Sequence, residues 1–176
     1  TTSINLAYYL SKLKREVLLI DFDPQGNASS ALGVAHGPGT PSTYEVITGQ
    51  LTIGEVLQAC PDIDNLWVCP ATIDLSGAEI ELVDLERREF RLADAVEYFV
   101  QAYQQIDLIL IDCPPSLGLV TLNVMVAADE VLIPIQTEYY ALEGLSQLWN
   151  TVERIGVDLN PGLRVSGMLL TMADKR

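Results

Sequence analysis

Two aspartates, Asp21 and Asp23, end a short apolar run and are the residues of this sequence whose type and spacing best suit chemistry. The run, residues 17–20, is continuously apolar and partly β-branched, which predicts a parallel strand covered on both faces. On an extended chain, side chains two residues apart point to the same side, so both carboxylates can face one site. Paired carboxylates in that place suit a hydrated Mg²⁺ ion and a water molecule that must be oriented.

The residues that follow Asp23 favour a tight turn. Pro24 and Gly26 favour turn geometry, and Gln25 and Asn27 supply neutral hydrogen-bonding groups. A second interpretation is that an Asp-Pro-x-Gly turn merely ends the strand and binds nothing. These residues alone leave both interpretations open.

A second acid, Asp112, ends the apolar run 108–111 and is followed by Cys113-Pro-Pro-Ser-Leu-Gly118. We expect a second buried strand here. An apolar strand that ends in aspartate is the usual form of a Walker B element, which holds the Mg²⁺ of a bound nucleoside triphosphate. This second motif favours the chemical interpretation of the first.

Strand and helix patterns alternate along the chain and predict the elements that hold these acids. Strands are expected at 17–20, 66–70, 108–112, 130–135 and 165–170, and helices at 1–14, 43–48, 71–85, 90–103, 119–128 and 142–155, with a helical turn at 54–59. The 71–85 helix is expected to be amphipathic and on the surface, and Trp149 is expected in the packed face of the 142–155 helix. The alternation is typical of an α/β fold with a doubly wound, mostly parallel sheet. Ligands of such sheets bind at the carboxyl ends of the strands, where the three acids are predicted.

Three stretches, in order and at typical separations, resemble one family. They are Asp-Phe-Asp-Pro-Gln-Gly-Asn at 21–27, Ile-Asp-Cys-Pro-Pro-Ser-Leu-Gly at 111–118 and Glu-Tyr-Tyr-Ala-Leu-Glu-Gly-Leu-Ser-Gln-Leu at 138–148. Together they resemble the ParA/Soj family of DNA-partitioning ATPases, over essentially the whole chain. The resemblance implies a P-loop NTPase-like fold that binds ATP and Mg²⁺.

The resemblance also implies roles for single residues. Asp23 would orient the attacking water, and Asp21 and Asp112 would support Mg²⁺. Gly118 and its neighbours would form the switch after the second acidic strand. The remaining nucleotide-binding positions that it implies are Thr1, near the α-phosphate, and Thr2, Pro24, Gln25 and Pro114.

In the family, the helix over residues 1–14 follows a deviant Walker A loop of the form Lys-Gly-Gly-x-Gly-Lys-Thr-Thr. Asn5 and Leu6 align Thr1 with the second threonine of that loop, so the loop and the strand before it are expected to lie outside these residues. Residues 1–176 are therefore expected to be a single partial ATPase domain, truncated at both ends. Because such loops bind phosphates through backbone N–H groups and a lysine, the 176 residues alone are expected not to bind ATP.

The implied partners are a second copy of the chain when ATP is bound, DNA without sequence preference, and a ParB-like protein that stimulates hydrolysis. Ten Lys and Arg residues against 24 Asp and Glu give a net charge of −14, which argues against a DNA surface made by overall charge. A local basic cluster would be needed. Lys175-Arg176 is the candidate, with Arg176 as a weakly supported DNA contact, and a solvated chain end is the equal alternative.

Three other functions stay open. A MinD-like ATPase would act on membranes through a carboxyl-terminal amphipathic helix, which this sequence does not contain. A nitrogenase-reductase-like protein would need cysteines placed for a shared cluster, and Cys60, Cys69 and Cys113 do not match that placement. The third is a non-catalytic interaction module. With no secretory signal, no apolar run of membrane-spanning length and no disulfide or zinc pattern, we expect a cytoplasmic, nucleoid-associated protein without a membrane partner.

Overall fold

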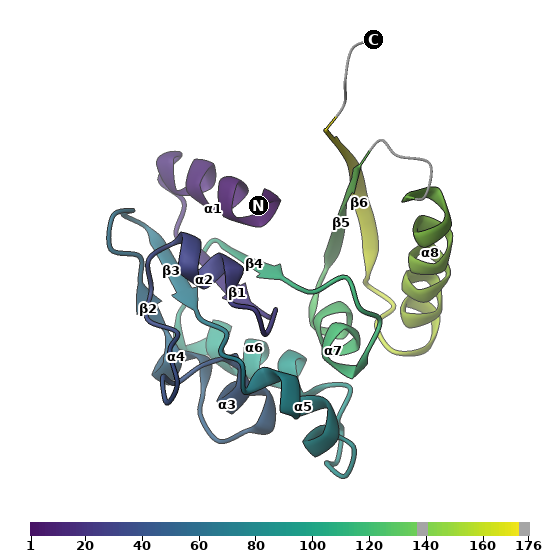
Figure 1. The fold of residues 1–176 in the computed structure, drawn as a ribbon, viewed down its shortest axis with the longest axis horizontal. Helices are drawn as coiled ribbons and strands as arrows, with labels where there is room; N and C mark the ends of the chain where they lie inside the picture. The colour runs from purple at the N-terminus through teal and green to yellow at the C-terminus, as the bar shows by residue number, and fades with distance from the viewer. Residues whose placement is uncertain (137–140, 173–176) are drawn as a thin grey trace. The chain divides into compact units, whose positions relative to one another are not determined.

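The computed structural model describes residues 1–136 and 141–172. It forms two compact units, Thr1–Val124 and Met125–Arg176 (Figure 1). The first unit contains both acidic motifs and most of the helices. The second contains a smaller pair of strands.

The sheet of the first unit has four strands in the order β2-β3-β1-β4. β1 (Val17–Asp21) lies between β3 (Leu66–Cys69) and β4 (Leu108–Asp112), and all three run parallel. β2 (Gln58–Ala59) pairs antiparallel with β3 at one edge. Every residue of β1 is buried, as its apolar run predicts. The predicted α/β class with a mostly parallel sheet is therefore confirmed.

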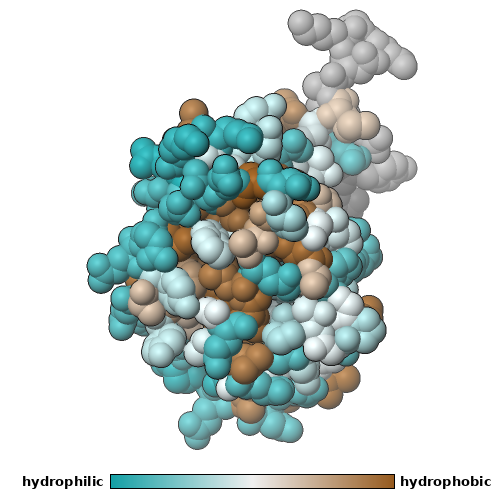
Figure 2. Space-filling model, turned by 90° about the vertical axis from the view of Figure 1, so that its left-hand side faces the viewer, coloured by the Kyte–Doolittle hydropathy of each residue, from teal (hydrophilic) through white to brown (hydrophobic). Residues whose placement is uncertain are grey.

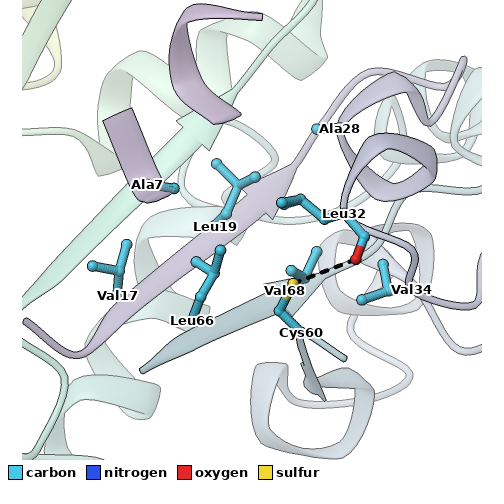
Figure 3. Close-up of a cluster of buried hydrophobic side chains, with 9 residues drawn as sticks. All are labelled: Ala7, Val17, Leu19, Ala28, Leu32, Val34, Cys60, Leu66 and Val68. Carbon is cyan, nitrogen blue, oxygen red and sulfur yellow. Dashed lines mark hydrogen bonds between the residues drawn. The ribbon is translucent and has the colours of Figure 1, made fainter. Parts of the chain in front are cut away.

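Helices cover both faces of this sheet, as expected for a doubly wound fold. The helices α1 (Thr2–Lys12) and α2 (Asn27–Ala31) cover the face that carries Val17 and Leu19 (Figure 3). Leu18 and Ile20 point to the opposite face and are equally buried. The remaining helices of the unit are α3 (Thr43–Thr48), α4 (Ile53–Val56), α5 (Leu75–Leu82) and α6 (Arg91–Ala102). α7 (Leu119–Ala127) begins in the first unit and ends in the second.

The helical turn expected at 54–59 is wrong in its second half. A capping box between Thr52 and Glu55 starts α4 at Ile53, and the helix ends at Val56 because Leu57 is extended (φ −60°, ψ 133°). Gln58 and Ala59 then pair with β3 instead of continuing the helix. From this short edge strand, the side chain of Gln58 bonds the backbone of Ala35.

β4 is less buried than its apolar sequence predicts. Leu108 is 40% exposed and the other four residues are partly buried. Among the described residues β4 pairs on one side only, with β1. The expectation of a fully buried strand is therefore wrong for β4, since an edge strand has one less neighbour to cover it.

α5 lies at the surface, as the sequence predicts, within narrower bounds, but its predicted amphipathic character is wrong because its exposed side also carries an apolar side chain. Leu75, Ala78 and Leu82 are fully buried, whereas Ile80 and Val83 are exposed.

On the face drawn in Figure 2, apolar side chains gather towards the middle and hydrophilic ones surround them. A net charge of −14 therefore coexists with apolar surface.

The second unit holds β5 (Glu130–Gln136), which pairs parallel with β6 (Arg164–Thr171), and α8 (Ala141–Asp158). The buried stripe of α8 includes Val152 and Ile155. Trp149 is 45% exposed, so its predicted place in the packed face is wrong. At about 100° per residue it lies about 60° around the helix from Val152, on the flank of the stripe.

One side chain joins the ends of two helices in this unit. Nδ2 of Asn160 lies within 3.1 Å of the carbonyl oxygens of Met125, Val126 and Ala128, and its Oδ1 accepts a hydrogen bond from the N–H of Gly162. These bonds satisfy carbonyl groups that the last turn of α7 leaves free. None of the helices in the described residues combines the length and the apolar character needed to span a membrane.

Candidate functional site

The two acidic strand ends lie side by side. In the parallel register of β1 and β4, Asp21 is the direct neighbour of Asp112. The N–H of Phe22 donates to the carbonyl of Asp112 at 2.7 Å, which extends the pairing by one residue beyond the strands. Neighbouring strands lie about 4.8 Å apart, so the sheet brings two predicted acids to one edge.

Asp21 is completely buried and fully bonded within the protein. Its Oδ2 accepts hydrogen bonds from the N–H and the hydroxyl of Ser29, at 2.8 and 2.7 Å, and its Oδ1 accepts a longer one from the N–H of Asp23, at 3.3 Å. Burial raises the pKa of Asp21, the bonds from Ser29 and Asp23 lower it, and the nearby charge of Asp112 raises it again, with burial dominant. Asp21 therefore joins α2 to β1 at the base of the site.

Ser29 is a site residue that the sequence did not reveal. Its Oγ donates to Asp21 and accepts a hydrogen bond from the N–H of Ala71 at 3.1 Å. The serine is fully buried and links α2 to the end of β1 and to Ala71, which lies 42 positions further along the chain. Its only signal is its place two residues after Asn27, which identifies no partner.

Asp23 lies on the predicted turn and is only partly buried. Its Oδ1 accepts from the N–H of Gln25 at 3.0 Å, and its carbonyl accepts from the N–H of Gly26 at 2.8 Å. Gly26 has φ +61°, and a Cβ there would lie 3.0 Å from Nδ1 of His36 and 3.2 Å from the carbonyl oxygen of Ala71. Glycine is therefore required at this position for two reasons, its backbone angle and the lack of space.

The turn leaves its polar groups at the surface. The side chain of Gln25 is exposed and its Oε1 accepts from Nδ2 of Asn27 at 3.2 Å, and Pro24 is partly buried. Asp23 thus has a carboxylate with a fixed backbone and access to solvent. A carboxylate in this state can orient a water molecule or accept a proton.

Asp112 is partly exposed and is held by the first helix. Its Oδ1 accepts a hydrogen bond from the hydroxyl of Ser3 at 2.7 Å. Ser3 lies in the first turn of α1, after Thr1 and Thr2. The amino end of α1 therefore lies next to the end of β4, and the free N–H groups of a first helical turn favour anions. Nothing in the sequence marks Ser3 as a partner of Asp112.

The segment after Asp112 runs from β4 to α7. Cys113 is exposed as a residue, but poor solvation of its sulfur, followed by the charges of Asp112 and Asp23, raises the pKa of its thiol to about 11. Pro114 and Gly118 are partly buried. A Cβ on Gly118 would overlap the carboxylate of Glu79, so this glycine lies next to the end of a side chain from α5.

A separate open hollow of about 520 Å³ is lined by Tyr44, Ile73, Asp74, Gly77 and Glu81. The hydroxyl of Tyr44 lies 3.0 Å from both carboxylate oxygens of Glu81, and this hydrogen bond is the main cause that raises the pKa of Tyr44. None of the predicted site residues that the structure describes lines this hollow. The chemistry of the acids therefore lies elsewhere.

Similarity to known proteins agrees with this geometry. A family model described as an AAA domain matches residues 1–165. Over all 176 residues the chain is 52% identical to the chromosome partitioning protein ParA of Myxococcus xanthus and covers 61% of that protein. It is 48% identical to the chromosome-partitioning ATPase Soj of Treponema pallidum and covers 67% of it. The chain belongs to the ParA/Soj family. It spans about three fifths to two thirds of the length of these relatives.

A solved structure supports the same fold for this ParA/Soj chain. The cobyrinic acid a,c-diamide synthase of Mycobacterium smegmatis, with bound ADP and magnesium, is similar at a TM-score of 0.88 and 36% identity. The similarity covers 99% of this chain and 69% of that one. The predicted P-loop NTPase-like α/β class is therefore confirmed, and so is the predicted relation to an ATPase family.

Part of the predicted site lies outside the described residues. Arg176 is one such residue, and so are the first three residues of the motif at 138–148, although α8 begins at Ala141. Within the part of the ParA/Soj chain that the structure describes, no three or more His, Cys, Asp or Glu side chains group as they would around a metal ion.

Proposed function

We propose that this chain supplies the acidic residues of a Mg²⁺-dependent ATP-hydrolysing site in a DNA-partitioning ATPase. The observation that carries the proposal is the pairing of Asp21 with Asp112 at adjacent strand ends, with Asp23 on a fixed turn two residues further on. Phosphoryl transfer needs little covalent help from a protein, because positioning and neutralisation of charge carry most of it. Residues 1–176 would then be one part of a single ATPase domain.

The two strand-end acids fit a magnesium ion that is shared with phosphates. Mg²⁺ is usually held by one or two carboxylates, substrate phosphate oxygens and water, and does not require a cage of protein ligands. Asp112 is partly exposed and has one oxygen without a hydrogen bond to Ser3, so it is the better placed to face the ion. Asp21 is buried and supports the ion's surroundings through its charge and through its hold on α2. Bound Mg²⁺ would neutralise charge on the phosphates.

Asp23 is the residue that we assign to the attacking water. Its carboxylate is accessible, whereas its backbone is fixed by bonds to Gln25 and Gly26. ATP would lie between this turn, the amino end of α1 and the segment after β4. The proposed nucleotide contacts are Thr1, Thr2, Pro24, Gln25, Pro114 and Gly118, the last as part of a switch.

The proposed partners follow from the family and from its relatives' names as partitioning proteins. ATP would drive formation of a homodimer, the dimer would bind DNA without sequence preference, and a ParB-like protein would stimulate hydrolysis. Since the net charge is −14, DNA would have to meet a local basic cluster such as the one that includes Arg176. We propose a cytoplasmic, nucleoid-associated location for the assembly, with no membrane partner.

A graft tests the proposal. Residues 1–176 replace the corresponding segment of the Treponema pallidum Soj ATPase, to which they are 48% identical. We expect the grafted ATPase to bind Mg-ATP in calorimetry and to hydrolyse it. Asp23→Ala should keep ATP affinity and lower turnover roughly 10²-fold, the usual scale for a positioned acid–base group. Asp21→Ala should weaken Mg-ATP binding itself, because it removes both charge and the hold on α2.

Asp62→Ala is the matched control, since Asp62 is an exposed aspartate in the turn before β3, where the parallel strands begin, and the three acids lie at or just after the carboxyl ends of those strands. It should change neither affinity nor turnover by more than about twofold. The proposed division of labour is wrong if Asp23→Ala turns over at the rate of the control, or if it loses ATP binding as severely as Asp21→Ala. A grafted protein without ATP hydrolysis would overturn the proposed function as a whole.

A further inference from the structure

His36, the single histidine of the chain, lies against the turn that carries Asp23. Its Nε2 is 2.9 Å from the hydroxyl oxygen of Ser30, and its Nδ1 is 3.0 Å from the place where a Cβ on Gly26 would stand. Gly26 is the residue before α2 and Ser30 lies in its last turn. The half-buried ring thus lies along one side of α2, from Gly26, the residue before the helix, to its last turn.

The segment around His36 is itself fixed from two sides. The side-chain amide of Gln58, on β2, donates to the carbonyl of Ala35 at 2.8 Å and accepts from its N–H at 2.9 Å. Val34 is buried in the cluster that also contains Leu32 (Figure 3), and its N–H donates to the carbonyl of Ser29. The backbone next to His36 is therefore bonded to the edge strand of the sheet.

Hydrogen bonds join α2 to the turn that carries Asp23. The carbonyl of Gly26 accepts the N–H of Ser30 at 2.9 Å, and the N–H of Gly26 donates to the carbonyl of Asp23 at 2.8 Å. Asp21 holds the other side of α2 through Ser29. Two contacts thus hold α2 and the turn in place: Asp21 bonds Ser29, and His36 bonds Ser30.

We propose that His36 is a positioning residue for ATP hydrolysis, acting through Ser30 and Gly26 on the orientation of the Asp23 carboxylate. This inference rests on the proposed function. Among the described residues the hydrogen bond of the His36 ring goes to Ser30 and not to one of the acids, so we expect His36 to affect the geometry of the step and not the affinity for ATP. A misplacement of a catalytic group by about 1 Å can cost about 10²-fold in rate, and a loosened support should cost less.

In the grafted ATPase, His36→Ala should therefore lower kcat about tenfold while the KM for ATP changes by less than about twofold. Ser30→Ala removes the same hydrogen bond from the other side and should give the same split. His36→Gln retains a group able to bond Ser30 and should recover part of kcat, whereas His36→Phe retains only the ring and should not. The double variant of His36 and Ser30 should be no worse than either single one.

A second measurement uses the 176-residue chain and needs no ATP. His36→Ala should speed amide hydrogen exchange at Gly26 and Ser30, while exchange in β1 stays unchanged. Gln58→Ala should act in the same direction, because it frees Ala35. Gln50→Ala is the matched control, since the side chain of this exposed glutamine bonds Thr48 and Tyr44 and not α2 or the segment around His36, and it should change neither exchange nor kcat.

The outcomes separate the two proposals. If the unmodified graft does not hydrolyse ATP, the proposed function fails and this inference fails with it. If the unmodified graft is active and the His36 variants have its kcat, only the positioning role of His36 is overturned. A loss of kcat that comes with an equal loss of ATP affinity, or with faster exchange throughout β1, would show general destabilisation and would also overturn it.

Discussion

Replacing Ser29 by alanine should destabilise the first unit, by an amount that follows from two bonds. The hydroxyl donates to the buried carboxylate of Asp21, and a hydrogen bond to a charged group contributes about 1.5–3 kcal/mol. The same oxygen accepts from the N–H of Ala71, and a buried N–H that loses its partner costs about 1–3 kcal/mol. The expected loss in the free energy of unfolding is therefore about 2.5–6 kcal/mol at pH 7.

The loss should depend on pH in a defined direction. Burial raises the pKa of Asp21 above its ordinary value of 3.8, and the bonds from Ser29 bring it part of the way down. Without the hydroxyl the pKa rises further, so the ionised carboxylate becomes less favourable in the folded chain. The cost should be largest at neutral pH and should shrink as the pH falls towards 4, because a protonated Asp21 loses a weaker bond.

Urea unfolding followed by Trp67 fluorescence measures this, in a Trp149→Phe background so that the signal comes from the first unit. Trp67 lies on β3, and its indole N–H donates to Glu16 at 3.2 Å. Ser76→Ala, an exposed serine on α5, is the control and should cost under about 0.5 kcal/mol. An equal cost of Ser29→Ala at pH 7 and pH 4.5, or an unchanged cost in an Asp21→Asn background, would refute the reasoning.

Two further predictions concern the turn and the end of the chain. Gly26→Ala should destabilise by about 1–3 kcal/mol in the same unfolding assay, because it forces a side chain into φ +61° against His36 and the carbonyl of Ala71. Gly37→Ala, which has open space and no positive φ, should change stability little, and equal effects at both glycines would contradict this account. In the grafted ATPase, Arg176→Ala should weaken DNA binding and flatten its salt dependence by about one unit of slope without changing ATP affinity, as measured by fluorescence anisotropy across salt. An unchanged salt slope would remove Arg176 from the DNA contacts.

The acidic edge of the sheet could be predicted because its signals are local. Five consecutive residues of β1 are buried, and strand polarity alone places Asp21 and Asp112 at the same edge. The tight turn at Gly26 follows from Asp-Pro-x-Gly in the same way. These features need only a short window of sequence and the rules of a parallel sheet.

The supports of the site could not be predicted, because each is a single polar contact between distant segments. Ser3 bonds Asp112 across 109 positions, and Gln58 bonds Ala35 across 23. Serine and glutamine are common on surfaces, so their type carries no signal until the fold brings a partner. The prediction for Trp149 was wrong for another reason. Its large apolar ring suggested burial, but its angle around α8 places it on the flank of the buried stripe.

The high pKa of the Cys113 thiol makes this cysteine slow to react with oxidants. Only the thiolate reacts readily with peroxides, and at a pKa of about 11 roughly one thiol in 10⁴ is ionised at pH 7. An exposed cysteine with an ordinary pKa would be more readily oxidised to sulfenic acid at this position, directly after Asp112. Poor solvation of the sulfur, and to a smaller extent the charges of Asp112 and Asp23, favour the protonated thiol, which reacts slowly with oxidants.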